Sequence, residues 1–360
     1  MELRRNIYLK LLEWKNQDVK NVLVVKGARQ LGKTYILKKF GKENFSKTIY
    51  ISMAEMSGRR FLKCLQAVRE LETITEAVIV RNALSLFETS FIDDTETLII
   101  IDEIQESAEV YNQICATSRD LQARVIVGSS YWGRVLNPEF LSPTEAIDYI
   151  TMETLTFYEF LDVFEEHELY ENIDLFGKGQ GEDYEKLMGY YEIYQKIGGY
   201  PAVVVSYAQQ KDLNKCYEKI GNLIDVFANE SKRYFDDVVD VNIFQKLFNA
   251  IALMMMQEKQ GGRDLVTELS KIAYQEESDC MTKKMINHAI SWLQESHVIG
   301  YASKAIDCDY KQVKENSRYY FLDMGIAYYF LSRTGAPYEV VKAALAENFK
   351  CLVNESHKSY

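Results

Sequence analysis

Gly27, Gly32, Lys33 and Thr34 follow the spacing G-x-x-x-x-G-K-T, and these residue types suit the binding of phosphate groups. Glycine lets the backbone turn sharply and approach an anion without a Cβ atom in the way. The loop N–H groups then point at the phosphate, and the following helix adds the positive end of its dipole. The lysine ammonium suits β- and γ-phosphates, and the threonine hydroxyl suits Mg²⁺. The pattern predicts a binding loop for a nucleoside triphosphate. The loop comprises Gly27, Ala28, Arg29, Gln30, Leu31, Gly32, Lys33, Thr34 and Tyr35.

An apolar run at residues 98–101 is followed directly by two acidic residues, Asp102 and Glu103. A buried parallel strand that ends in a carboxylate places it at the carboxyl edge of the sheet, where ligands bind in α/β folds. We expect Asp102 and Thr34 to hold Mg²⁺, and Glu103 to act as the general base that polarises the attacking water. The alternative is a strand that ends in a solvated acidic turn.

A third candidate group follows the strand expected at 124–127, where the chain reads Gly128-Ser129-Ser130. A polar side chain at the same edge of the sheet would sense the γ-phosphate or the attacking water. We assign this catalytic role to Ser129, with Ser130 as the alternative. A serine-rich turn after a strand explains either serine alone equally well.

Strands are expected to alternate with helices, which is typical of a parallel sheet covered on both faces. The expected strands are 22–26, 48–52, 97–101, 124–127 and 147–152. The expected helices lie within 1–20 and at 33–40, 59–90 (two helices) and 107–120. The acidic motif is on the third strand, so we expect the additional-strand class of P-loop folds, in which a further strand separates the two motif strands.

The fold class predicted is an α/β P-loop sheet domain at 1–155, followed by an α-helical domain at 156–240 with a firm break at 198–201. Residues 241–335 are expected to form a winged-helix-like domain, and 336–360 the start of a truncated C-terminal domain. The winged helix is indicated by three helices and two strands that flank a polar hairpin. These elements are 243–256, 264–274 and 282–295, then 297–301 and 319–322, with the hairpin at 307–318.

Charge restricts the partners of the chain. It carries 53 acidic and 42 basic side chains, a net charge of −11, which disfavours a general polyanion binder. Residues 241–335 contain as many acidic as basic side chains, so the winged helix lacks a basic footprint and a structural or protein-binding role is favoured over DNA binding. The acidic excess at 153–192 is a solvated surface or a contact for a basic protein partner.

Compartment signals favour a cytoplasmic protein without a membrane span. The sequence has no run of about 18 apolar residues and no apolar signal core at its N-terminus. The cysteines are dispersed without a C-x-x-C pair, which indicates reduced thiols and not a disulfide framework or a zinc site. They are Cys64, Cys115, Cys216, Cys280, Cys308 and Cys351.

The order of motifs resembles a family of prokaryotic AAA-type (AAA+) P-loop ATPases with a C-terminal domain of unknown function. The matching segments are 27–34, 101–105, 128–130, 155–160 (Leu-Thr-Phe-Tyr-Glu-Phe), 198–201 (Gly-Gly-Tyr-Pro), 320–325 (Tyr-Phe-Leu-Asp-Met-Gly) and 347–349 (Glu-Asn-Phe). The resemblance implies ATP as the nucleotide, a winged-helix middle region and often a nuclease-like domain at the C-terminus.

Two features depart from the family pattern. Its members usually carry a Gly-Arg pair just before the fifth strand, whereas residues 143–146 read Pro-Thr-Glu-Ala. Arg134 and Arg119 are possible substitutes, and slow turnover is expected unless a partner supplies an arginine. The sequence after Glu347 lacks the acidic strand and lysine of the nuclease-like domain, so no nuclease activity is expected.

The expected function is that of a Mg²⁺-dependent ATP-binding protein and slow ATPase, whose nucleotide state repositions the helical and winged-helix domains. Lys33, Glu103 and Ser129 are the expected catalytic residues, and Arg4 and Arg5 the suggested lining of the base pocket. Two alternatives stay open: an ATP-controlled DNA-binding regulator or defence module of the toxin–antitoxin type, and a nucleotide-bound scaffold that does not hydrolyse.

Overall fold

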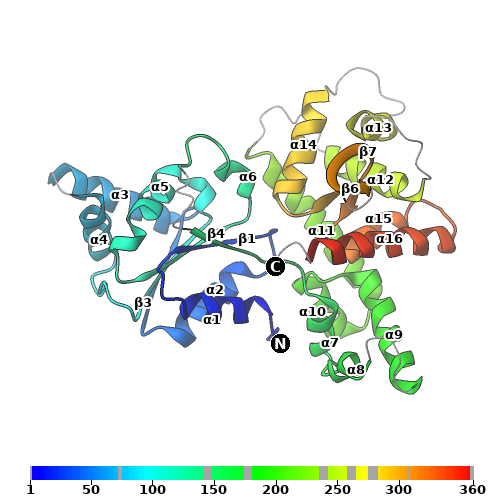
Figure 1. The fold of residues 1–360 in the computed structure, drawn as a ribbon, viewed down its shortest axis with the longest axis horizontal. Helices are drawn as coiled ribbons and strands as arrows, with labels where there is room; N and C mark the ends of the chain where they lie inside the picture. Colours follow the sequence, from blue (N-terminus) through cyan, green and yellow to red (C-terminus); the bar gives the residue numbers. More distant parts are fainter. Residues whose placement is uncertain are drawn as a thin grey trace. The chain divides into compact units, whose positions relative to one another are not determined.

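A computed structural model describes residues 2–71, 75–141, 147–173, 181–234, 242–257, 265–274, 283–306 and 309–356 (Figure 1). Contacts between residues divide the chain into two compact units. The first unit is Arg5–Glu153, and the second is Met1–Arg4 together with Thr154–Tyr360.

The first unit contains a five-stranded parallel sheet. Its strands are β1 (Val22–Lys26), β2 (Lys47–Ser52), β3 (Thr97–Asp102), β4 (Arg124–Ser129) and β5 (Ile147–Thr151). Their spatial order is β2-β3-β4-β1-β5, so β4 separates the strand before the glycine loop from the strand that ends in Asp102. This confirms the α/β P-loop sheet and the predicted additional strand between the two motif strands.

Helices cover both faces of the sheet, with α1 and α2 on one side and α3, α4 and α5 on the other (Figure 1). The helices are α1 (Ile7–Lys15), α2 (Lys33–Asn44), α3 (Met56–Leu71), α4 (Glu76–Phe87), α5 (Ala108–Thr117) and α6 (Trp132–Val135), with 3₁₀ turns η1 (Ile104–Glu106) and η2 (Ser118–Asp120). Successive side chains of a strand point to opposite faces of the sheet. Because helices pack on both faces, the apolar side chains on both sides of these strands are buried. All six residues of β3 are buried, so the polar end of this strand is held by a rigid, fully packed element.

The second unit is mainly helical. Its helices are α7 (Phe157–Asp162), α8 (Glu168–Glu171), α9 (Gly181–Ile197), α10 (Pro201–Gln210), α11 (Leu213–Ser231), α12 (Ile243–Met256), α13 (Leu265–Ala273), α14 (Lys283–Glu295), α15 (Met324–Leu331) and α16 (Tyr338–Ser356). An antiparallel hairpin joins β6 (Ile299–Ile306) to β7 (Asp309–Phe321). Around α12, the rings of Phe248, Phe321 and Phe330 pack together with centroids 5.1–6.1 Å apart.

Asp323 joins distant parts of this second unit. The buried carboxylate caps α15 by accepting from the Ile326 N–H at 3.0 Å, and it also accepts from the Gly199 N–H at 2.8 Å. The Gly199 carbonyl in turn accepts from the Leu155 N–H at 2.7 Å. A Cβ atom on Gly198, where φ is +70°, would lie 2.2 Å from the Asp323 carboxylate, so this turn requires glycine.

The other segments quoted for the family resemblance also have structural roles. Thr156 and Glu159 form a reciprocal capping box at the start of α7. The Asn348 side chain bonds both backbone groups of Phe321, at 2.8 and 3.0 Å. These motifs of the second unit hold its elements together.

Most expected elements are found within a few residues of their predicted bounds, but the hairpin differs. β6 and β7 are longer than the expected strands at 297–301 and 319–322, and they extend through most of the segment expected to be a polar hairpin. Some segments and residues that the sequence singles out lie outside the described residues: the glycine break at 261–262, most of the loop at 177–181, Cys280 and Cys308. Within the described residues, Cys64, Cys115, Cys216 and Cys351 are not in disulfide bonds. The division of the second unit into helical, winged-helix-like and C-terminal domains stays a prediction.

Candidate functional site

The glycine loop connects β1 to α2 and has an unusual backbone. Gly27 has a φ of +150° and Gly32, which caps α2, a φ of +88°; Gln30 lies between them at +64°. A Cβ atom on Gly27 would come within 2.2 Å of the Met152 carbonyl oxygen, at the end of the neighbouring strand β5. Glycine is therefore required at this position both by the backbone angle and by the close approach of another chain segment.

The buried Lys33 side chain lies over its own loop. Its ammonium donates to the carbonyl oxygens of Gly27 at 2.8 Å and Ala28 at 2.7 Å. The positive charge is thus held next to the backbone turn in which the sequence predicts phosphate binding. A buried ammonium is a costly group, and one held at this turn suits the binding of an anion.

The structure brings Thr34 and Asp102 together, although they lie 68 positions apart. The Thr34 hydroxyl donates to Asp102 Oδ2 at 2.5 Å. The other oxygen, Oδ1, accepts the backbone N–H of Glu103 at 3.0 Å. These are hard oxygen donors, which suit Mg²⁺.

The donor set at Thr34 and Asp102 fits Mg²⁺ better than a transition metal. Within the described residues, no group of three or more His, Cys, Asp or Glu could hold a metal ion. Mg²⁺ is normally held by one or two protein oxygens, water and the phosphates of the nucleotide, so it needs no such cluster. One hydroxyl and one carboxylate beside a phosphate loop meet this requirement.

Tyr50 is a member of the site that the sequence did not reveal. Its hydroxyl donates to Asp102 Oδ2 at 3.1 Å, and the Lys38 ammonium lies 3.6 Å from the centre of its ring. Burial, together with the negative charge of Asp102, raises the pKa of Tyr50, so the hydroxyl stays protonated and continues to donate. Its place on β2 beside β3 brings it to Asp102, a neighbourhood set by strand order and not visible in local sequence.

Glu103 follows Asp102 in a left-handed backbone conformation, with a φ of +53°. Its carboxylate accepts from the Ser130 hydroxyl at 2.7 Å and from the Gln105 side-chain amide. The fully buried Gln105 also accepts from the Ser129 hydroxyl at 2.9 Å. Ser130 therefore contacts the carboxylate directly, whereas Ser129, the residue assigned to the catalytic group, orients Gln105 behind it.

The arginines suggested by the sequence occupy different environments. Arg5 is buried, and its guanidinium donates to the backbone carbonyls of Leu31 at 3.0 Å and Glu153 at 2.6 Å. Because Leu31 belongs to the glycine loop, the Arg5 side chain helps to hold this loop in place. Arg119 lies in η2 and Arg134 in α6. Residues 143–146, where the family carries its Gly-Arg pair, lie outside the described residues.

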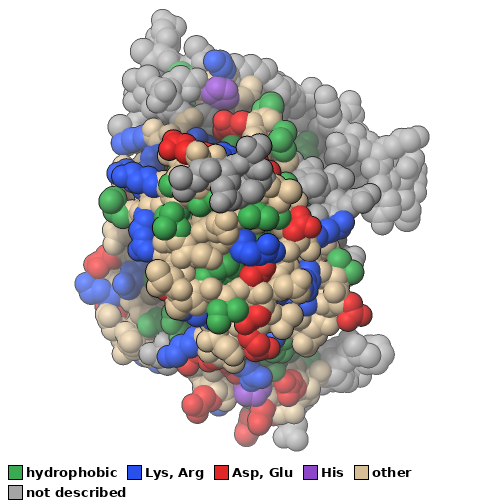
Figure 2. All heavy atoms as spheres, turned by 90° about the vertical axis from the view of Figure 1, so that its left-hand side faces the viewer, with side chains coloured by type: hydrophobic (Ala, Val, Ile, Leu, Met, Phe, Trp, Pro, Cys, Tyr) green, Lys and Arg blue, Asp and Glu red, His purple; other side chains and the backbone are tan. Residues whose placement is uncertain are grey.

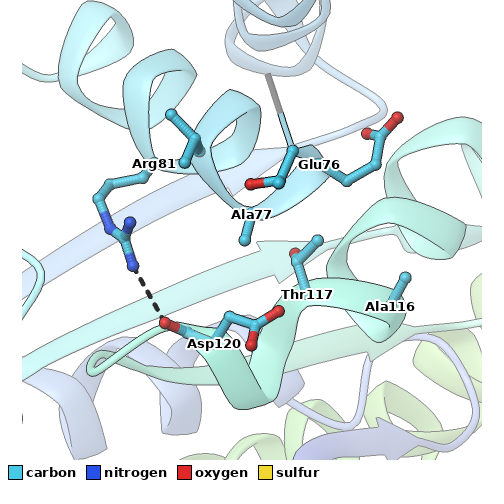
Figure 3. Close-up of a pocket in the computed structure, with 8 residues that line it drawn as sticks. Glu76, Ala77, Arg81, Ala116, Thr117 and Asp120 are labelled. Carbon is cyan, nitrogen blue, oxygen red and sulfur yellow. Dashed lines mark hydrogen bonds between the residues drawn. The ribbon is translucent and has the colours of Figure 1, made fainter. Parts of the chain in front are cut away.

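A surface cavity of about 420 Å³ lies between the start of α4 and the end of α5 (Figure 3). It is lined by Thr75, Glu76, Ala77, Val78, Arg81, Ala116, Thr117 and Asp120. Arg81 donates to the Asp120 carbonyl at 3.0 Å across this cavity and pairs with Asp93 at 2.7 Å. None of the predicted site residues lines it, so it is separate from the glycine loop and the acidic pair.

On the face drawn in Figure 2, basic and acidic side chains of the described residues are interspersed. Within the described part of the chain, no helix is both long enough and apolar enough to cross a bilayer.

Comparison with known families assigns most of the chain. Residues 19–161 match the sequence model of an AAA domain, and residues 188–336 match that of a domain of unknown function (DUF8612). Among curated proteins, none matches the chain.

Several solved structures match over most of their length. They include Orc1 of Aeropyrum pernix in complex with DNA, at 12% identity, TM-score 0.31 and coverage of 97% of this chain and 93% of that one. The Holliday junction branch migration motor RuvB of Thermotoga maritima matches at 13% identity and TM-score 0.38, over 84% of this chain and 90% of that one. Cdc6p of Pyrobaculum aerophilum matches at 10% identity and TM-score 0.29, over 95% of this chain and 93% of that one. At these TM-scores the likeness supports no inference about function.

Proposed function

Because the chain belongs to the AAA-type P-loop ATPases, with a domain of unknown function after its AAA domain, we propose that it binds ATP together with Mg²⁺ and hydrolyses it slowly. The observation that carries this proposal is the contact between Thr34, at the end of the glycine loop, and Asp102, at the end of β3. In this class of fold, residues at these two positions would hold the metal.

Each residue of the site has a role in this proposal. The loop amides of residues 28–34 and the Lys33 ammonium bind the phosphates, and Thr34 and Asp102 hold the metal. When bound, Mg²⁺ neutralises charge on the phosphate oxygens. Glu103 accepts a proton from the water that attacks the γ-phosphorus, and Ser130 and Gln105 orient its carboxylate.

Replacing Lys33 with alanine tests nucleotide binding. We expect Lys33→Ala to weaken ATP binding by about ten- to a hundredfold, because a charge-assisted contact to the phosphates is lost. The measurement is calorimetric titration with ATP and Mg²⁺, with thermal unfolding as a check that the loop still folds. Lys39→Ala is the matched control, since Lys39 lies on the same helix and pairs with Glu43 at the surface, 3.8 Å away. A folded Lys33→Ala protein that binds ATP as tightly as the wild type would contradict the proposal.

We also propose that α12, α13, α14 and the β6–β7 hairpin form a winged helix that contacts protein and not DNA. The support is that these three helices contact one another, that α14 contacts β6, and that residues 241–335 carry balanced charge. We also propose that the nucleotide state repositions the winged helix, and that the protein is cytoplasmic. The acidic segment at 153–192 is proposed as a contact for a basic protein partner.

A further inference from the structure

Arg29 occupies the third position of the glycine loop, and its side chain lies at the carboxylate of Glu103. Arg29 Nη2 is 3.7 Å from Glu103 Oε2, which is an ion pair and not a hydrogen bond. The pair is largely shielded from water, since the two side chains are 25% and 18% exposed. The loop thus contributes a cation, as well as its backbone amides, to the neighbourhood of the acidic pair.

The position of this cation follows from the roles proposed for its neighbours. A general base must come within one water molecule of the phosphorus that the water attacks. A guanidinium already close to that base is then near the γ-phosphate, which the same loop binds. A phosphate group carries more negative charge than a carboxylate and offers several oxygens to the planar fork of arginine.

We propose that Arg29 contacts the γ-phosphate of bound ATP and supplies, from the chain's own glycine loop, the positive charge that stabilises the transition state. The proposal rests on the proposed function, and it replaces the expectation that Arg119, Arg134 or a partner must supply this charge. When a triphosphate enters, Arg29 exchanges its pairing with Glu103 for the γ-phosphate. The Glu103 carboxylate keeps its hydrogen bond from Ser130 and becomes available to the water.

The test compares affinities for a non-hydrolysable ATP analogue and for ADP, because only the analogue has a γ-phosphate. With Mg²⁺ present, we expect Arg29→Ala to weaken binding of the analogue about ten- to a hundredfold and to leave ADP binding within about twofold of the wild type. Phosphate release is expected to fall by about 10³-fold or more, as for the loss of an arginine finger. Arg29→Lys should recover part of the affinity but little of the rate, because lysine lacks the planar fork.

Arg69→Ala is the matched control, since Arg69 pairs at the surface with Glu76 and Glu109 and lies on α3. Equal weakening of ADP and analogue binding by Arg29→Ala would assign Arg29 to loop structure and overturn the proposal, as would unchanged affinity for both. A wild type that binds both nucleotides without turnover would refute only hydrolysis, and the ratio of the two affinities would still decide the role of Arg29. A wild type that binds neither would refute nucleotide binding and this proposal together.

Discussion

Replacing Glu103 with glutamine is expected to reduce ATP turnover by about 10²–10⁴-fold and to leave ATP binding near the wild-type value. Glutamine has the same shape, and its carbonyl oxygen still accepts a hydrogen bond from Ser130, which lies 2.7 Å from the carboxylate. The amide cannot accept a proton from water at neutral pH, so the base is lost while the site remains assembled. The measurement is phosphate release at saturating ATP, paired with calorimetric titration of ATP.

The variant separates chemistry from binding because Glu103 is not among the residues proposed to hold phosphate or metal. Its left-handed backbone and its hydrogen bonds with Ser130 and Gln105 fix the carboxylate in one orientation. Strained backbone of this kind is common where a side chain must be aimed for function. A local unfolding effect of the substitution is detected by thermal unfolding of the same sample.

Glu96→Gln provides the control for this experiment. Glu96 is exposed and precedes the first residue of β3, at the opposite end of the strand from Glu103. We expect its rate and affinity to match those of the wild type. If the wild type is active and Glu103→Gln releases phosphate at the same rate, the general base is another residue. If neither the wild type nor Glu103→Gln releases phosphate, hydrolysis is refuted and ATP binding remains as the function.

The strands of the first unit were predictable because each is a short apolar run bounded by turn residues. Residues 22–26 and 97–101 are examples, and both agree with the structure within one residue. The further strand between the two motif strands was predictable from the chain position of the acidic motif. The hairpin in the second unit was predicted too short because residues 307–318 are mostly polar and lack the apolar alternation by which strands are recognised.

The site was predictable only in part, for a related reason. Thr34 and Asp102 belong to motifs with known spacing, so their meeting at one edge of the sheet could be expected. Tyr50 and Gln105 reach the site through strand neighbours and a left-handed turn, and neither carries a local signal. The pairing of Arg29 with Glu103 joins residues of two motifs, and a pattern reports the spacing within a motif but not the side-chain contacts between motifs.

Loss of the Asp323 carboxylate is expected to be the most destabilising change in the second unit. In Asp323→Ala, the buried N–H groups of Gly199 and Ile326 lose their acceptor, and α15 loses its N-cap. Each effect costs about 1–3 kcal/mol, so we expect the free energy of unfolding to fall by about 3–5 kcal/mol. Denaturant titration of the full chain measures this, with the exposed Asp225→Ala on α11 as control. A loss below about 1 kcal/mol would contradict the proposed role of this carboxylate.

The same carboxyl group predicts a pH dependence. Burial raises the pKa of Asp323 to about 6 from 3.8, against the hydrogen bonds from Gly199 and Ile326. Because the folded state binds this proton more tightly than the unfolded chain, the stability contributed by the group is full below about pH 4 and is lost as pH rises through 6. The comparison is with Asp323→Asn, which does not titrate. Relative to this variant, the free energy of unfolding of the wild type should fall by up to about 3 kcal/mol between pH 4 and 7. If the wild type instead became more stable than Asp323→Asn as the pH rises, the hydrogen bonds from the backbone would outweigh burial and favour the ionised carboxylate.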